Sequence, residues 1–202
     1  MIRILNKFQP NPYPGIEIDT TSRGNNKDLS PFYLGPVVAF NGEEVTNVEN
    51  YWQYSKVYPE HATPPTSFEL INNPLCHEPK EEYYEWRLRG WKTQRAVRYP
   101  MGKGAKPLYS LYHHHKLGYV MARKLIYIPA YAFAVIKTKS YAMLYEAALA
   151  KQDIVLRDFD GYDYQSMDMT LLDVVNNPSK SMGHAFVIAM LLTGEIHKCM
   201  EV

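Results

Sequence analysis

The chain lacks several features that would define its class at once. Only two cysteines occur among 202 residues, Cys76 and Cys199, and their separation fits neither a disulfide framework nor a zinc site. The longest apolar run, Leu125 to Ile136, is interrupted by Pro129 and is far shorter than the ~20 residues of a membrane span. We therefore expect a cytoplasmic protein that has no membrane partner.

A charge surplus is also missing, because 22 Lys and Arg stand against 21 Asp and Glu. This balance argues against a surface devoted to nonspecific phosphate binding, although a local basic patch is compatible with it. The sequence contains no glycine-rich phosphate loop, nucleophile elbow or H-E-x-x-H motif, and no signal peptide, repeat or low-complexity segment. No cofactor and no metal ion is expected. The chemistry must therefore be sought in individual residues.

The pattern of apolar residues predicts an α+β fold, a single helix-rich domain with a small β-sheet. Residues 1–28 form a loop-rich N-terminal segment, residues 29–202 form the domain, and the Pro-rich segment 59–79 is predicted to be an insertion. Asn41-Gly42 predicts a tight turn between two short strands, and Gly194 is predicted to end the last long helix. Strands are predicted at residues 1–5, 15–19 and 154–156, and helices at 46–57, 81–99, 106–127, 140–151, 169–175 and 181–192.

One stripe of a predicted helix carries an acid, an amide and a base. Glu49, Gln53 and Lys56 are spaced four and then three residues apart, which aligns them along one face. Thr46 and Glu49 also have the T-x-x-E spacing of a capping box, in which the glutamate only closes the helix start. A carboxylate at a helix N-terminus is favoured in its ionised form, so Glu49 could also stabilise a developing cation. Both roles stay open at this stage.

Three aspartates follow the predicted strand at residues 154–156. Asp158, Asp160 and Asp163 surround Gly161, and acids at the end of a buried strand are held rigidly while they stay accessible. The same spacing is typical of an ordinary turn, and it also resembles a calcium loop that lacks the closing glutamate. The segment is therefore either a turn or part of a site.

The aromatic and basic residues allow two interpretations. The 17 tyrosines suit a cleft for a heteroaromatic ligand and also suit simple packing. Three consecutive histidines, 113–115, are predicted in a helix, where adjacent side chains diverge too far to chelate one ion. A further predicted helix combines Trp86 and Trp91 with basic residues. Either the tryptophans belong to the core and the charges are solvated, or the helix recognises a phosphate and a base. Its basic residues are Arg87, Arg89, Lys92, Arg95 and Arg98.

Two motifs resemble those of a known family. Leu29-Ser30-Pro31-Phe32-Tyr33 and Val48-Glu49-Asn50-Tyr51-Trp52-Gln53-Tyr54-Ser55-Lys56 resemble the L-S-N-F-Y and V-E-H-x-x-Q-x-x-K motifs of the NADAR (YbiA-like) family. Further along, Gly90-Trp91 with Arg95 and Met101, and then Ile154 to Asp163, resemble later family segments, and Gly183-His184-Ala185-Phe186 is a weaker match. The resemblance extends from about Leu29 to Leu192. Asn50 stands where the family has histidine, and Pro31 where it has asparagine.

The resemblance implies a single-domain α+β hydrolase that breaks N-glycosidic bonds in ribosylated heterocycles or removes ADP-ribose from guanine bases. Glu49, Asp163 and Trp91 would be the catalytic residues. The partner would be a small-molecule nucleotide or an ADP-ribosylated base, free or within nucleic acid. The substrate-binding residues would be Ser30, Phe32, Asn50, Trp52, Gln53, Lys56 and Asp160.

Hydrolysis of a ribosyl C–N bond needs an anion near an oxocarbenium-like sugar and a base for water. Glu49 and Asp163 could supply these, with an ionised Glu49 as stabiliser and Asp163 as base, although spacing does not decide which does which. Two other classes stay open: a module that binds nucleotide or ADP-ribose without cleaving it, and a structural or interaction protein. The first expectation to test is that both carboxylates share one cleft.

Overall fold

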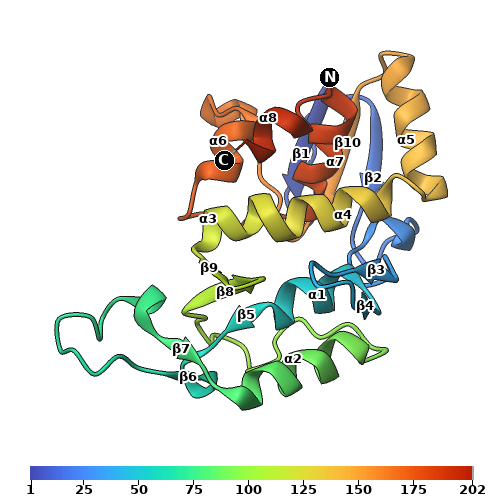
Figure 1. The fold of residues 1–202 in the computed structure, drawn as a ribbon. Helices are drawn as coiled ribbons and strands as arrows, with labels where there is room; N and C mark the ends of the chain where they lie inside the picture. Colours follow the sequence, from blue (N-terminus) through green and yellow to red (C-terminus); the bar gives the residue numbers. More distant parts are fainter. Residues whose placement is uncertain (202) are drawn as a thin grey trace.

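The computed structural model describes residues 1–201 and combines α-helices with small β-sheets (Figure 1). The predicted mixed α+β class is confirmed. The helices are α1 (Val48–Tyr54), α2 (Glu81–Lys92), α3 (Tyr119–Ala122), α4 (Ile128–Val135), α5 (Lys139–Leu149), α6 (Leu171–Asn176), α7 (His184–Thr193) and α8 (Ile196–Met200), with a π-helical turn, η4 (Arg123–Tyr127), between α3 and α4. The strands are β1 (Ile2–Asn6), β2 (Ile16–Asp19), β3 (Val37–Val38), β4 (Glu44–Val45), β5 (Lys56–Val57), β6 (Ala62–Thr63), β7 (Glu78–Pro79), β8 (Tyr109–Tyr112), β9 (His115–Leu117) and β10 (Ile154–Asp158).

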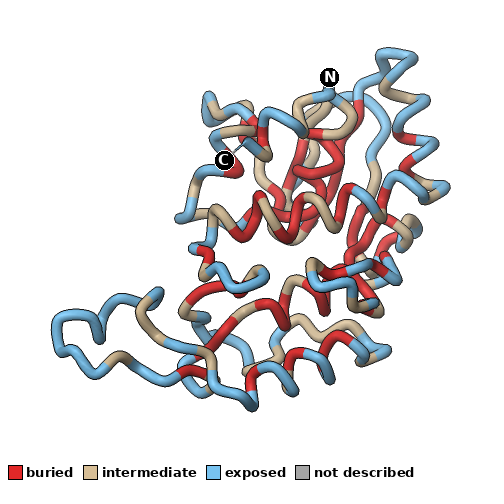
Figure 2. The backbone as a smooth tube through the Cα atoms, in the orientation of Figure 1, coloured by how far each residue is buried: buried red, intermediate tan, exposed pale blue. Residues whose placement is uncertain are grey.

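A three-stranded parallel sheet, in the order β1-β10-β2, pairs the two N-terminal strands with a strand from the C-terminal third of the chain. The central strand β10 is buried along its whole length, as expected of a continuous apolar run in a parallel sheet. Helix α7 packs beside β1 and β10 (Figure 1), and the burial colours place both in the core (Figure 2). The sheet therefore delivers Asp158, the last residue of β10, to the edge of a rigid core.

A second layer contains α1, α2 and the antiparallel sheet β5-β8-β9 (Figure 1). Helices α1 and α2 approach closely at Gly90, where an added Cβ would lie 2.0 Å from the ring of Tyr54. Glycine is therefore required for this contact. The close packing holds α1 so that its first turn faces the core layer.

Several local predictions are confirmed. Strands β3 and β4 form an antiparallel hairpin, and Gly42 in its turn has a φ of 84°. Gly194 ends α7 in the left-handed conformation. The segment 59–79 contains β6, β7 and an exposed loop that projects from the body (Figure 1), in which Phe68 is 86% exposed. That this segment is an insertion stays a prediction.

Several local predictions are wrong. The helix predicted at residues 106–127 is absent from residues 109–117, which form β8, a turn and β9. The triple histidine lies in this turn and at the start of β9, and His113 has a φ of 52°. The helix predicted at residues 81–99 ends at Lys92, so Arg95 and Arg98 lie in the following loop. Arg87 is buried among aromatic rings, with Trp91 4.8 Å away, and Lys92 pairs with Glu43. The basic residues therefore do not form one solvated helix face.

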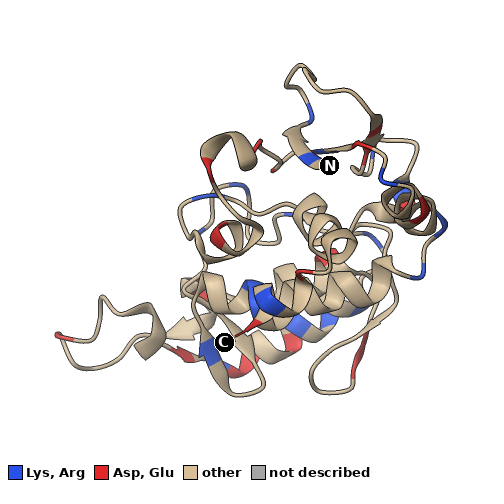
Figure 3. Ribbon diagram, turned by 90° about the horizontal axis from the view of Figure 1, so that it is seen from above, with Lys and Arg blue, Asp and Glu red and all other residues tan. Residues whose placement is uncertain are grey.

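Charged residues of both signs are interspersed over the molecule rather than gathered by sign (Figure 3). Within residues 1–201 no single helix is long and apolar enough to cross a membrane, and the one pair that passes by length and composition, Tyr119–Val135 with Lys139–Leu149, is bent by 88°. Both cysteines are free thiols.

Candidate functional site

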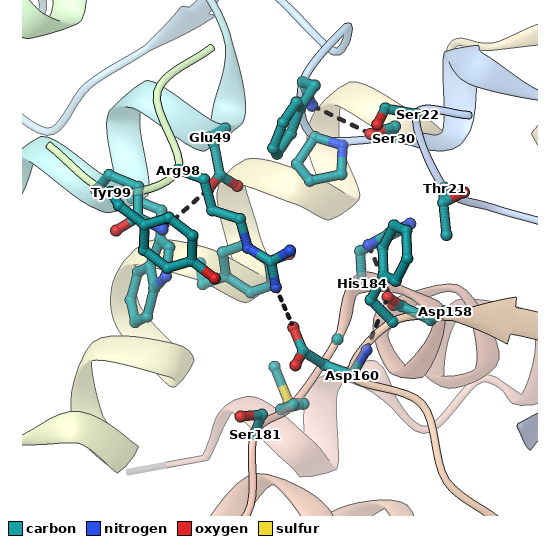
Figure 4. Close-up of a pocket in the computed structure, with 18 of the residues that line it drawn as sticks. Thr21, Ser22, Ser30, Glu49, Arg98, Tyr99, Asp158, Asp160, Ser181 and His184 are labelled. Carbon is teal, nitrogen blue, oxygen red and sulfur yellow. Dashed lines mark hydrogen bonds and ion pairs between the residues drawn. The ribbon is translucent and has the colours of Figure 1, made fainter. Parts of the chain in front are cut away.

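A cavity of about 600 Å³ lies where the two layers meet. Its walls come from residues 21–23 after β2, residues 30–32, helix α1, the loop after α2, the α3–η4 segment, the end of β10 and the start of α7. Acidic, basic and aromatic side chains all line it (Figure 4). A volume of this size is typical of small-molecule sites.

Glu49 enters this cavity from the first turn of α1. The helix is capped by Asn47, whose side chain accepts the N–H of Asn50 at 2.8 Å, so the Thr46 capping box is wrong. The N–H of Glu49 donates to the carbonyl of Pro31, and the carboxyl group faces the cavity (Figure 4). Glu49 is only 6% exposed.

Burial raises the pKa of Glu49 above its usual value, because an ionised carboxylate loses its hydration there. The hydrogen bond from Gln53 and the positive charges of Lys56, Arg98 and His184 oppose this shift without cancelling it. The helix N-terminus predicts an ionised Glu49, whereas burial shifts the pKa of Glu49 in the opposite direction. The protonated form is favoured relative to a carboxylate in water.

Gln53 and Lys56 continue from Glu49 as a chain of hydrogen bonds. Gln53 Nε2 donates to Glu49 Oε1 at 2.9 Å, and Lys56 Nζ donates to Gln53 Oε1 at 2.7 Å. Lys56 also lies 4.7 Å from the ring centre of Trp52. Burial lowers the pKa of Lys56 to about 8, while the charge of Glu49 acts in the opposite direction. Gln53 and Trp52 line the cavity, and Lys56 stands behind them.

Asp158 and His184 form a buried side-chain pair on the opposite wall. His184 Nδ1 lies 3.1 Å from Asp158 Oδ2, and His184 Nε2 lies 2.8 Å from the carbonyl of Thr20. Both ring nitrogens of His184 therefore lie within hydrogen-bond distance of an oxygen atom. The N–H of Ala185 also donates to Asp158 Oδ2, so this carboxylate caps the start of α7. An added Cβ at Gly183 would lie 2.2 Å from the same oxygen.

Asp160 lies two residues beyond β10 and pairs with Arg98, whose Nη2 is 3.3 Å from Asp160 Oδ2 (Figure 4). Burial and the nearby charge of Asp158 raise the pKa of Asp160, and Arg98 and His184 oppose that shift. The side chain is nevertheless 41% exposed, so water reaches it. Asp160 combines a raised pKa with access to solvent.

Asn50 is fully buried and holds the loop that carries Arg98. Its Nδ2 donates to the carbonyls of Thr93 and Arg95 at 2.8 and 3.2 Å, and its Oδ1 accepts the N–H of Val97 at 2.9 Å. It does not line the cavity. The structure therefore places Asn50 behind the site, although the resemblance implied contact with substrate.

Aromatic rings form one side of the cavity. Trp52 packs against Tyr127, with ring centres 5.2 Å apart, and against Tyr119 at 6.3 Å. Burial and the charges of Glu49 and Asp158 raise the pKa of Tyr127 well above its usual value, so its hydroxyl stays neutral. Such a wall suits a flat ligand.

Asp163 and Trp91 lie outside the cavity. Asp163 accepts hydrogen bonds from Arg3 and from the hydroxyl of Tyr13, which hold it beside the N-terminal segment. Trp91 is fully buried between Phe40 and Tyr51 in the core. The expectation that Asp163 shares a cleft with Glu49 is therefore wrong, because long-range partners turn its side chain away.

Of the ten residues predicted to be catalytic or substrate-binding, six line the cavity, and Lys56 is one hydrogen bond behind them. Asp158, Arg98 and His184 also line the cavity; the sequence analysis noted all three without assigning them a role in the site. Tyr127 lines it too, and no sequence signal indicated this residue. The six predicted residues that line the cavity are Ser30, Phe32, Glu49, Trp52, Gln53 and Asp160.

Comparison with known proteins identifies a family but no activity. A model of the DUF6939 family, described as a family of unknown function, matches residues 5–188. No curated protein and no solved structure matches the chain. Among residues 1–201 no group of three or more His, Cys, Asp or Glu side chains is arranged to hold a metal ion. The resemblance to NADAR proteins therefore remains a prediction.

Proposed function

This chain belongs to the DUF6939 family of unknown function, and we propose that it is a hydrolase that cleaves the N-glycosidic bond of a ribosylated or ADP-ribosylated heterocyclic base. One observation carries the proposal. A buried carboxyl group with a raised pKa, Glu49, and a water-accessible carboxyl group, Asp160, line one cavity that also has an aromatic wall. Glycoside hydrolysis uses two carboxyl groups with different environments in this way.

Glu49 is the proton donor in this proposal. As the C1′–N bond breaks, its electron pair passes to the leaving nitrogen, which takes the proton of Glu49. Asp160 is the base: the oxygen of a water molecule bonds to C1′ and its proton passes to the Asp160 carboxylate. A proton then returns from Asp160 to Glu49 through solvent, so one water is consumed per turnover. Asp160 thus replaces Asp163 in the role expected of it.

The remaining contacts match the parts of such a substrate. The rings of Trp52 and Tyr127 offer a stacking surface for the leaving base. Arg23, which lies on the rim and 5.9 Å from the ring of Phe159, offers a charge for a phosphate. The carrier is a free nucleotide or a modified nucleic acid. Arg98 already pairs with Asp160, so in this proposal it positions the Asp160 carboxylate.

A second candidate is a module that binds the nucleotide or ADP-ribose without cleaving it. The two side-chain pairs favour it, since the carboxylates of Asp158 and Asp160 already have partners in His184 and Arg98. A carboxylate held by an arginine is a weaker base than a free one. Binding without release of a base would support this alternative.

The two candidates separate in one experiment. Purified protein is incubated with a guanine-ADP-ribosylated oligonucleotide and, separately, with a ribosylated riboflavin-pathway intermediate, and the released base is measured by chromatography. We expect release by the wild type, a fall of at least about 100-fold in Glu49→Gln, and near wild-type release in the matched control Asp163→Asn. Binding to either compound without any release would replace the hydrolase with the binding module.

A further inference from the structure

The chain of hydrogen bonds behind Glu49 has only one arrangement of donors and acceptors. The ammonium group of Lys56 can only donate, so the group it contacts at 2.7 Å must be the oxygen of the Gln53 amide. The Gln53 NH₂ group is then turned toward Glu49, and Glu49 Oε1, 2.9 Å away, must accept from it. A lysine that lies outside the cavity thereby determines which way the amide faces inside it.

This orientation also favours one oxygen of Glu49 as the site of its proton. In a protonated carboxyl group the carbonyl oxygen is a better hydrogen-bond acceptor than the hydroxyl oxygen. The hydrogen bond from Gln53 to Oε1 therefore favours a proton on Oε2. No hydrogen bond to another side chain or to the backbone is recorded for Oε2 within the described part of the chain.

We propose that Lys56 and Gln53 are positioning residues that keep the acidic proton of Glu49 on Oε2, the oxygen left available to a ligand. In this arrangement neither residue is required to touch the substrate for the effect. Its consequence for catalysis rests on the proposed N-glycosidase function, whereas the orientation of the amide is a property of the free protein. The inference replaces the substrate-binding role that the resemblance implied for Lys56.

Loss of the ammonium group would release the amide. Without a cation behind it, Gln53 can turn over and present its oxygen to Glu49, which would then donate its proton to Gln53 instead of to a leaving base. The positive charges of Arg98 and His184 act to lower the raised pKa of Glu49, but neither residue hydrogen-bonds to the Gln53 amide. The hydroxyl of Tyr127 and the carboxyl groups of Asp158 and Asp160 also face the cavity. Within residues 1–201, Lys56 is the one hydrogen-bond partner of the Gln53 amide oxygen.

Four variants separate positioning from a general loss of charge or stability. Lys56→Met removes the donor, Lys56→Arg keeps a permanent donor and charge, and Gln53→Met removes the amide. Lys92→Met is the matched control, since Lys92 pairs with Glu43 away from the cavity. Each variant is first checked for cooperative unfolding.

The direct measurement follows the side-chain amide of Gln53 by ¹⁵N–¹H NMR in the free protein as pH is varied. In wild type, Lys56→Arg and Lys92→Met we expect the amide signals to shift as Glu49 titrates. The shift is attributed to Glu49 because it should disappear in Glu49→Gln. In Lys56→Met this response should fall to less than half. An unchanged response in Lys56→Met would overturn the proposal. If Lys56→Met does not fold, the wild type decides it: the Gln53 signals must also shift over the pH range in which Lys56 loses its proton, followed by the ¹⁵N signal of Lys56 Nζ. Constant Gln53 signals over that range would overturn the proposal.

Turnover provides the second measurement. With a ribosylated substrate, kcat should fall about 10- to 100-fold in Lys56→Met and Gln53→Met with little change in KM, and Lys56→Arg should recover most of it. A rise in KM at constant kcat would instead assign Lys56 to substrate binding and refute positioning. If the NMR result holds and the wild type shows no turnover, the proposed function fails while the orientation of Gln53 stands.

Discussion

Replacement of Asn50 by alanine tests how the cavity is built. Asn50 is fully buried and makes three hydrogen bonds, two as donor and one as acceptor, to the backbone of residues 93–97. This loop leads directly to Arg98, which pairs with Asp160. One amide side chain thus connects α1 to the opposite wall of the site.

The expected cost follows from these contacts. A hydrogen bond contributes about 0.5–1.5 kcal/mol net, and a buried group that loses its partner costs about 1–3 kcal/mol. Three bonds are lost, but the loop can relax toward water, so we expect Asn50→Ala to lower the free energy of unfolding by about 3 kcal/mol. Asn50→Asp should cost at least as much, because aspartate has no donor for the carbonyls of Thr93 and Arg95 and would bury a charge.

Urea denaturation measures this loss. The matched control is Asn41→Ala, because Asn41 is exposed and accepts a single bond from the N–H of Glu43 at 3.3 Å. The control should stay within about 0.5 kcal/mol of wild type. A loss below about 1 kcal/mol in Asn50→Ala would refute the reasoning, because the loop would then be held by other contacts.

Three further results are expected. Gly183→Ala should lower the free energy of unfolding by about 1–3 kcal/mol in thermal denaturation, because the new Cβ would lie 2.2 Å from the Asp158 carboxylate. Asp160→Asn should reduce base release at least about 10-fold, whereas Asp163→Asn should leave it within about twofold of wild type, as Asp163 lies outside the cavity. The pKa of Lys56 is lowered from 10.5 to about 8, so the unfolded chain binds more protons between these values and this group's contribution to stability rises with pH there. Below pH 8, Lys56→Met should therefore have a higher free energy of unfolding than wild type. The gain is at most about 3 kcal/mol, reduced by the loss of the hydrogen bond to Gln53, and it should shrink toward pH 10.5.

Each of these has a control. Gly118→Ala should cost less than Gly183→Ala: both glycines are N-caps and share the ~1 kcal/mol penalty of alanine there, but nothing lies within 4 Å of an added Cβ at Gly118. An equal loss in both glycine variants would contradict the steric argument. Equal effects of the two aspartate variants on base release would remove Asp160 from the mechanism. A difference between wild type and Lys56→Met that does not change from pH 8 to pH 10.5 would show that Lys56 keeps its ordinary pKa.

The sequence by itself determined the elements whose signals are local. The apolar run that became β10, the Asn-Gly turn between β3 and β4, and Gly194 at the end of α7 each depend on neighbouring residues only. The spacing of Glu49 and Gln53 on one helix face likewise held, because helix geometry links residues four apart. Local signals were insufficient at the triple histidine, where the chain forms the turn of a hairpin although a helix was predicted.

The assembly of the cavity was decided only by the tertiary structure. Asp158, Asp160 and Asp163 look equivalent in the sequence, yet they separate into a helix cap beside His184, a half-exposed wall residue and a partner of Arg3 and Tyr13. The side-chain partners of these three aspartates lie 26 to 160 positions away in the chain. The state of Glu49 was decided in the same way. Its position at a helix start predicts a carboxylate, but the layers that close over it remove the water that would stabilise the charge.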